Sequence, residues 1–233
     1  MIDFYYAPTP NGWKVGIMLE ECGLSYQTHL MRLGQGDQFA SDFLNISPNA
    51  KMPAIVDHDV DGEPVSVFES GAILLYLAEK TGCFAPTDQQ GRKELMEWLF
   101  WQVGNLGPMA GQLSHFRNYA PKDEAYSQKR YAGEYDRNLG VLERRLIDQK
   151  FILESYSIAD MIAFPWVFIA KPLGADLDGF PNVKAWRQRI KDRPAVMRAI
   201  DLHKDRQNRG QDRADNNNIL FNQTAAHLTG KKP

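Results

Sequence analysis

One change in the apolar pattern limits the possible folds of this chain more than any other feature. Over the first eighty residues, patterns typical of strands alternate with patterns typical of helices. After the loop around Pro86-Thr87-Asp88 the strand signals disappear and helical spacing dominates. This order predicts an α/β domain followed by an all-helical domain, and 233 residues are enough for two modest cores.

The first part of the chain has the order strand, helix, strand and then strand, strand, helix. We expect strands at residues 2–7, 26–33, 54–56 and 65–68. The first helix is predicted from apolar residues at helical spacing, namely Val15, Met18, Leu19 and Cys22. A second helix is expected to begin at Ser70. Gly23 and Gly82 follow the two predicted helices, at positions where a left-handed backbone conformation ends a helix and favours glycine. Residues 8–12, between the first strand and the first helix, are expected to form a loop because proline cannot continue a strand ladder.

The second part of the chain has helical signals only. A long helix is predicted from one apolar stripe, formed by Tyr131, Tyr135, Leu139, Leu142 and Leu146. Ser157 and Asp160 have the spacing of a capping box, and a further helix is expected over 181–192. From about residue 205 the sequence is polar and basic, which favours a tail that is mobile or lies over the surface.

These patterns predict where the domains begin and end. We expect an α/β domain at 1–82, a linker at 83–91, a helical domain at 92–205 and a polar tail at 206–233.

Composition excludes several classes of function. The formal charge is −2, from 27 basic and 29 acidic side chains spread along the chain, so no basic surface is expected for nucleic acid. No apolar run approaches the roughly 20 residues of a membrane span, and the start lacks a signal-peptide pattern. Two cysteines are too few for a disulfide framework, and the five histidines lack the spacing of metal ligands. We expect a cytoplasmic protein without a metal.

Four segments, together with this order of elements, resemble a known superfamily. They are Ala7 to Gly12 (APTPNG), Ile46 to Ile55 (ISPNAKMPAI), Phe68 to Ile73 (FESGAI) and Trp98 to Gln102 (WLFWQ). The chain resembles the glutathione transferases over about residues 1–205, and these segments look like the nu class of bacterial disulfide-bond reductases, which are related to the globular domain of a fungal nitrogen-regulatory prion protein.

The resemblance implies a fold, an activity and an assembly. The fold is a thioredoxin-like domain (βαβ-ββα) followed by the all-helical C-terminal domain of the glutathione transferases. The activity is glutathione-dependent reduction of disulfides, with two glutathiones or one glutathione disulfide bound, alongside reduction of organic hydroperoxides. The resemblance also implies a homodimer with glutathione as co-substrate. Two alternatives stay open, namely a conventional transferase that conjugates electrophiles and a glutathione-binding regulatory protein without catalysis.

Thr9 and Asn11 are the candidate catalytic residues. A free thiol has a pKa near 8.5 and reacts as the thiolate, so the site must stabilise an anionic sulfur. The resemblance to the glutathione transferases implies that these two residues donate a hydrogen bond to the glutathione sulfur. The donor is a hydroxyl, an amide or a backbone N–H. The alternative from local sequence alone is a simple turn ending in Asn-Gly. Tyr5 and Tyr6 are rival sulfur ligands, but their place inside a strand favours core packing.

Glu69 and Ser70 are the candidate ligands of the γ-glutamyl group. The start of the helix at Ser70 offers backbone N–H groups to the carboxylate, and Glu69 can accept hydrogen bonds from the ammonium. The alternative is that Ser70 only caps its helix.

The resemblance implies three further contacts with glutathione, from Met52, Gln38 and Arg130. The Met52-Pro53 bond is cis, and the backbone of Met52 pairs with the cysteinyl residue. Gln38, taken as an exposed loop residue, binds the glycyl end. Lys51 has the charge to neutralise the glycyl carboxylate, and the alternative is a solvated lysine. Arg130 binds the carboxylate of a second glutathione through its forked guanidinium.

Overall fold

The computed structural model describes residues 1–121, 123–204 and 219–229. The chain separates into two compact units. Unit 1 contains residues 1–73 and the C-terminal stretch from Arg198, and unit 2 contains residues 74–197. Two helices run across this division, α3 (Ser70–Thr81) and α9 (Pro194–Asp201).

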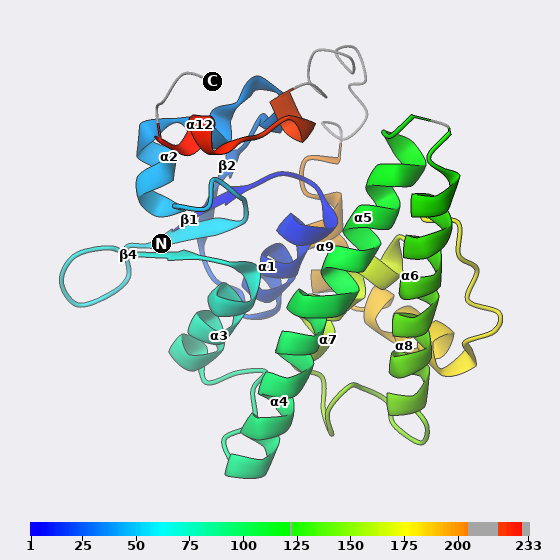
Figure 1. The fold of residues 1–233 in the computed structure, drawn as a ribbon. Coiled ribbons are helices and arrows are strands. Elements are labelled where there is room, and N and C mark those ends of the chain that lie inside the picture. The colour runs from blue at the N-terminus through cyan, green and yellow to red at the C-terminus, as the bar shows by residue number, and fades with distance from the viewer. Residues whose placement is uncertain (122, 205–218, 230–233) are drawn as a thin grey trace. The chain divides into compact units, whose positions relative to one another are not determined.

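Unit 1 is built on a four-stranded mixed sheet. The strand order is β2 (Tyr26–Leu30), β1 (Ile2–Tyr6), β3 (Ala54–Asp57) and β4 (Val65–Phe68) (Figure 1). β1 pairs with β2 in parallel and with β3 in antiparallel orientation, and β3 and β4 form the predicted hairpin. The predicted order βαβ then ββα is confirmed, and the fold is the expected thioredoxin-like one.

The two faces of this sheet are covered by different helices. Alternate residues of a strand point to opposite faces, so Phe4 and Tyr6 share one face, where their rings stack at 4.7 Å. Helix α1 (Pro10–Glu21) covers this face, since a Cβ atom at Gly16 would lie 3.7 Å from the Phe4 ring. Tyr5 lies on the other face, with its ring 5.7 Å from that of Phe43 in α2 (Ser41–Ile46).

Several boundaries differ from those predicted. β1 ends at Tyr6 and α1 begins at Pro10, so the predicted loop of 8–12 is shorter by its last three residues. Proline is favoured in the first helical turn because its missing N–H has no partner there in any case. β2 ends at Leu30 and is followed by two single-turn 3-10 helices, η1 (Leu33–Gln35) and η2 (Asp37–Phe39). These turns and α2 are too short to carry an apolar period, which is why the sequence gives no sign of them.

Unit 2 is all-helical, as predicted, within the residues that the structure describes. Its helices are α4 (Gln89–Trp101), the π-helical segment η3 (Gln102–Leu106), α5 (Gly107–Asn118), α6 (Ala125–Arg145), α7 (Ile158–Phe168) and α8 (Pro181–Lys191). α5 and α6 lie side by side (Figure 1), and the rings of Phe116 and Tyr131 stack at 5.4 Å between them. The predicted stripe of α6 is confirmed, because Tyr135, Leu139 and Leu142 are buried.

The predicted capping box at the start of α7 is confirmed. The Ser157 hydroxyl accepts a hydrogen bond from Ala159 N–H at 3.3 Å, and Asp160 accepts one from Ser157 N–H at 3.0 Å. Asp160 is fully buried and also accepts hydrogen bonds from Ile152 N–H (2.9 Å) and Trp186 Nε1 (2.8 Å). Burial raises the pKa of Asp160 to about 6, while these hydrogen bonds oppose the rise.

Where it is described, the C-terminal stretch packs against the N-terminal part of unit 1. The predicted tail falls largely on residues 205–218 and 230–233, which lie outside the described residues. In the described remainder, which includes α12 (Ala225–Thr229), Gln223 accepts a hydrogen bond from Lys51 Nζ at 2.7 Å. The His227 ring lies 4.8 Å from that of Phe39. The predicted domain limits of 1–82, 83–91, 92–205 and 206–233 stay a prediction.

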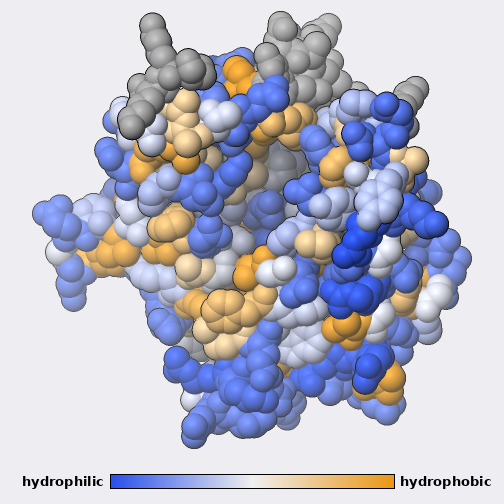
Figure 2. Space-filling view, viewed as in Figure 1, coloured by the Kyte–Doolittle hydropathy of each residue, from blue (hydrophilic) through white to orange (hydrophobic). Residues whose placement is uncertain are grey.

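Figure 2 shows mostly hydrophilic residues on the visible face, with small groups of hydrophobic residues among them. Among the helices of the described residues, none is long and apolar enough to cross a membrane.

Candidate functional site

Thr9 and Asn11 stand where β1 passes into α1. Thr9 is the residue before the helix, with an extended backbone (φ −130°, ψ 163°), and its hydroxyl makes no capping hydrogen bond. That hydroxyl instead lies 4.0 Å from Met52 Sδ, a weak donor contact to sulfur. Asn11 belongs to the first turn of α1 and not to a loop, so it stands at the positive end of a helix dipole. A helix start of this kind suits an anionic sulfur.

Gly12 holds this turn close to the end of β1. A Cβ atom at Gly12 would lie 2.2 Å from the backbone oxygen of Ala7, a distance that no side chain tolerates. The backbone of Thr9 turns back in the same way, since its N–H donates to the Ala7 oxygen at 2.7 Å. The position of Asn11 is therefore fixed by a tight backbone contact.

Glu69 and Ser70 form a second polar group in unit 1. Glu69 has a φ of 68°, a left-handed conformation that is uncommon outside glycine, and its side chain is exposed. Its Oε1 accepts a hydrogen bond from Asn49 Nδ2 at 3.2 Å. Ser70 is the first residue of α3 and is 8% exposed. The cap position belongs to Glu69, whose backbone oxygen accepts from Ile73 N–H at 2.9 Å, so capping does not account for the Ser70 hydroxyl.

Lys14 contacts Ser70 and is a residue that the sequence analysis missed. Its side chain is 3% exposed, and its Nζ donates to Ser70 Oγ at 3.4 Å, a long hydrogen bond. Burial lowers the pKa of Lys14 to about 7, and the nearby Glu69 carboxylate opposes this. A sequence signal existed, because Lys14 lies four residues before Met18 and so falls on the buried face of α1.

The Met52-Pro53 bond is cis, as the resemblance implied. Met52 lies two residues before the start of β3, and its side chain packs against the cluster formed by Met31, Phe43 and Ala54. The backbone contact of Met52 with a ligand stays a prediction.

Gln38 is not the exposed loop residue that we expected. It lies in η2 and is 1% exposed, and its Nε2 donates to the Leu33 backbone oxygen at 3.1 Å. Its Oε1 is closed off from solvent and has no hydrogen-bond partner among the described residues. The side chain therefore braces its own loop, and a direct contact with glutathione needs the loop to open.

Three further residues of the sequence analysis have defined partners. Tyr6 is buried as expected, with its hydroxyl donating to the Leu202 backbone oxygen at 3.1 Å, and Tyr5 stacks on His29 at 4.5 Å. Arg130 lies on α6 in unit 2, where its guanidinium pairs with Glu134. Its predicted contact with a second glutathione stays a prediction.

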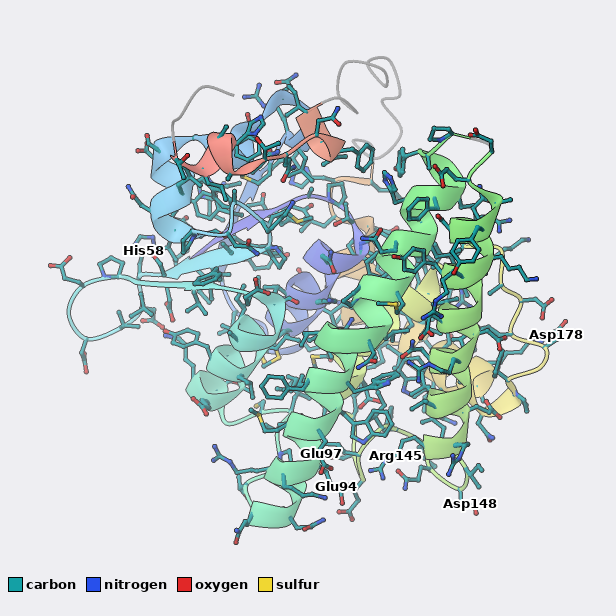
Figure 3. All side chains as sticks on the ribbon, viewed as in Figure 1. His58, Glu94, Glu97, Arg145, Asp148 and Asp178 are labelled. Carbon is teal, nitrogen blue, oxygen red and sulfur yellow. The ribbon has the colours of Figure 1, made fainter. Side chains whose placement is uncertain are left out.

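A pocket in unit 2 and a side-chain cluster in unit 1 lie apart from the candidate residues in the sequence. A pocket of about 810 Å³ in unit 2 lies near the start of α4 and the residues before α7, and Arg145 pairs there with Glu94 at 3.0 Å (Figure 3). In unit 1, Asp3 lies between His29 (3.0 Å) and His58 (2.8 Å). No group of three or more metal-ligating side chains in the described residues has the geometry to hold a metal ion.

Two family models match this chain, one in its N-terminal part and one in its C-terminal part. The family model of the glutathione S-transferase N-terminal domain matches residues 9–80, and that of the glutathione S-transferase C-terminal domain matches residues 124–189.

Comparison with individual proteins gives similar relatives. The chain is 50% identical over 203 residues to the disulfide-bond oxidoreductase YfcG of Escherichia coli, covering 86% of this chain and 94% of the relative. A glutathione transferase structure from Burkholderia graminis, with two glutathione molecules per subunit, matches with a TM-score of 0.82 and 46% identity over 87% of this chain and 88% of that one. A structure from Pseudomonas putida, with one glutathione disulfide per subunit, matches with a TM-score of 0.81 and 39% identity over 87% and 91%.

Proposed function

Because the chain belongs to the glutathione S-transferase family, we propose that it is a glutathione-dependent disulfide-bond reductase. The name of the similar Escherichia coli protein supports the reaction, and the ligands of the two similar structures support a site for two glutathiones or one glutathione disulfide. The proposed partners are therefore glutathione and a small-molecule disulfide.

One observation carries the proposal, namely that the hydrogen-bond donors at the start of α1 have no protein thiol beside them. Cys22 follows the opposite end of α1, about 18 Å along a twelve-residue helix, and Cys83 follows α3. The sequence has no third cysteine. The reacting sulfur therefore belongs to glutathione, and the protein supplies binding and electrostatic stabilisation.

The proposed reaction has two exchange steps. The thiolate of one glutathione attacks the substrate disulfide, which forms a glutathione mixed disulfide and releases one substrate thiolate. The thiolate of the second glutathione then attacks the glutathione sulfur of this mixed disulfide, giving glutathione disulfide and a second substrate thiolate. Two electrons pass from two glutathiones to one disulfide, and the two protons lost by glutathione protonate the released thiolates. Holding both tripeptides in one site makes the second attack local.

Thr9 and Asn11 are proposed to stabilise the attacking thiolate. Lowering a thiol pKa by one unit requires about 1.36 kcal/mol. A hydrogen bond to a charged group supplies about 1.5 to 3 kcal/mol, and a helix start adds about 0.3 to 1 kcal/mol. Two such donors are therefore sufficient to make the glutathione sulfur anionic at neutral pH.

The remaining site residues are proposed to hold the tripeptide. Ser70 and the start of α3 bind the γ-glutamyl carboxylate, and Glu69 binds the ammonium. The backbone of Met52 pairs with the cysteinyl residue. Gln38 orders the loop at the glycyl end, and Arg130 binds the carboxylate of the second glutathione.

Parallel assays test the reaction class. With glutathione as reductant, we expect turnover of bis(2-hydroxyethyl) disulfide, formation of glutathione disulfide and only weak conjugation of 1-chloro-2,4-dinitrobenzene. Cumene hydroperoxide tests the expected side activity, in which two glutathiones reduce the peroxide to an alcohol and water. Fast conjugation without disulfide turnover would instead make the protein a conventional transferase. Binding of glutathione without any turnover would make it a regulatory binding protein.

Asn11→Ala tests the thiolate site directly. We expect disulfide turnover to fall about thirtyfold, which corresponds to about 2 kcal/mol of lost stabilisation of the anion, while glutathione still binds. Asn45→Ala, at an exposed position on α2, is the matched control and is expected to keep full activity. Unchanged turnover in Asn11→Ala would place the chemistry elsewhere.

A second copy of the chain is the proposed partner protein. Met96, Phe100 and Val103 are spaced by four and three residues along α4 and η3, and all three are exposed, Phe100 by 64%. An apolar stripe of this kind on a helix favours a protein contact. Phe100→Glu is expected to turn a dimer into a monomer in sedimentation velocity, and a wild-type monomer at micromolar concentration would refute the assembly.

We also propose a cytoplasmic location, where glutathione keeps thiols reduced.

A further inference from the structure

Lys14 is an unusual residue for the interior of a small α/β unit. It lies in the middle of a run of buried residues on α1, from Gly12 to Leu19. Lysine is almost never fully buried in proteins. Removing an ammonium group from water costs roughly several kcal/mol unless neighbouring groups compensate for the lost hydration. A buried lysine therefore needs a reason.

The contact with Ser70 restricts how that hydroxyl can be used. An ammonium group has three donors and no acceptor, so at the 3.4 Å contact Lys14 donates and Ser70 Oγ accepts. The Ser70 hydroxyl hydrogen then points to another acceptor. In the neutral form, Lys14 has a lone pair and can accept this hydrogen, which would remove it from any ligand.

The charge environment favours an anionic partner at the same place. The Glu69 carboxylate acts on Lys14 through its charge, and it lies directly before α3. Burial lowers the pKa of Lys14 to about 7, so both protonation states are populated near neutrality. A carboxylate bound at Ser70 adds a negative charge close to the ammonium and so favours its protonated form.

We propose that Lys14 is a positioning residue for the γ-glutamyl carboxylate of glutathione, acting through the Ser70 hydroxyl. This inference rests on the proposed function, because it takes glutathione as the ligand. The Lys14 ammonium fixes Ser70 as a donor toward the carboxylate and places a positive charge behind the start of α3. Lys14 itself touches no reacting atom, so it affects binding of one end of the tripeptide and not the exchange of sulfur.

A binding experiment with two ligands separates this role from a general role in folding. The first ligand is glutathione, and the second is γ-aminobutyryl-cysteinylglycine, which lacks only the γ-glutamyl carboxylate. We expect Lys14→Met to weaken glutathione about tenfold in isothermal titration calorimetry, the loss of one charge-assisted hydrogen bond, while the analogue binds within about twofold of the wild type. Lys171→Met, at an exposed position in unit 2, is the matched control and is expected to bind both ligands normally.

Kinetics and a second variant give readouts that a structural role would not move. Lys14→Met is expected to raise KM for glutathione with kcat nearly unchanged, because the lost contact is made equally in the ground state and the transition state. Ser70→Ala is expected to weaken glutathione in the wild type and to have little further effect in Lys14→Met, since the two residues act on one carboxylate.

The outcomes distinguish the inference from the proposed function. Equal losses for both ligands, or full binding of glutathione by Lys14→Met, would overturn the role of Lys14 while leaving glutathione as the ligand. A wild-type chain that binds no glutathione at millimolar concentration would overturn the proposed function, and this inference with it.

Discussion

Two of the charged side chains buried in the described residues, Asp160 in unit 2 and Lys14 in unit 1, are accommodated in different ways. In unit 2, Asp160 accepts hydrogen bonds from two backbone N–H groups, the Ser157 hydroxyl and the Trp186 indole. All four donors belong to unit 2, the same unit as Asp160. In unit 1, Lys14 lies behind Ser70, a residue at the candidate site. The Asp160 carboxylate satisfies donors of its own unit, whereas the Lys14 ammonium is proposed to prepare a site for a ligand.

The same physical cause acts on both groups with opposite sign. Burial disfavours the charged form, so it raises the pKa of Asp160 to about 6 and lowers the pKa of Lys14 to about 7. Removing the charge relieves this cost at both positions, but at Asp160 it also disrupts four hydrogen bonds to the carboxylate. We therefore expect opposite net effects on the free energy of unfolding.

Asp160→Asn is expected to give the largest effect. The amide would place donors against donors and leave buried N–H groups without an acceptor, so we expect a loss of about 3 kcal/mol in the free energy of unfolding. Urea unfolding at pH 7 measures it. Asp136→Asn, at an exposed position on α6, is the control and is expected to change stability by less than about 0.5 kcal/mol. A loss below about 1 kcal/mol in Asp160→Asn would remove the contrast with Lys14.

Lys14→Met is expected to stabilise the fold at pH 7, by about 2 kcal/mol, because methionine fills a similar volume without burying a charge. The pKa of Lys14 is about 7 in the fold and 10.5 unfolded, so between these values the unfolded chain binds more protons and wild-type stability rises with pH. The variant loses this rise, and its advantage should shrink as pH increases. Urea unfolding at pH 7 and at pH 9.5 tests this. A destabilised variant, or equal slopes against pH, would make Lys14 a structural residue.

Paired serine variants give the smallest effect and compare the two helix starts. Ser157→Ala removes a cap and is expected to cost about 1 kcal/mol of stability. Ser70→Ala is expected to cost less than about 0.5 kcal/mol, because Ser70 lies inside the first turn of α3 and Glu69 holds the cap position. Thermal unfolding of both variants measures the difference. Equal losses would mean that Ser70 is an ordinary cap.

The regular elements and the start of α7 could be predicted because their signals are local. Ser157 and Asp160 are three residues apart, and their spacing alone defines the capping box that the structure contains. The long stripe of α6 was equally clear. The site was harder, because its groups come from distant segments. Gln38 follows a glycine-rich stretch that indicates an exposed loop, but the short turns of η1 and η2 bury it.

Lys14 was missed for a related reason. Its Nζ contacts Ser70 Oγ, 56 residues further along the chain. Pattern analysis assigns a lone lysine to the solvent side of a helix, and only a tertiary contact overrides that assignment. The predicted start of α1 was also wrong, because residues 8–12 were expected to form a loop and α1 begins at Pro10. A proline is as typical of a loop as of a first helical turn.

The placement of the cysteines has a consequence for durability. The Cys22 sulfur lies 3.9 Å from Met18 Sδ, at the far end of α1 from the candidate site. When peroxide oxidises the reacting thiolate of the proposed enzyme, the oxidised molecule is glutathione and not the protein. Glutathione dissociates and a reduced molecule replaces it. An oxidoreductase that carries its own nucleophilic sulfur must be repaired or discarded after overoxidation, whereas this chain would outlast many such events.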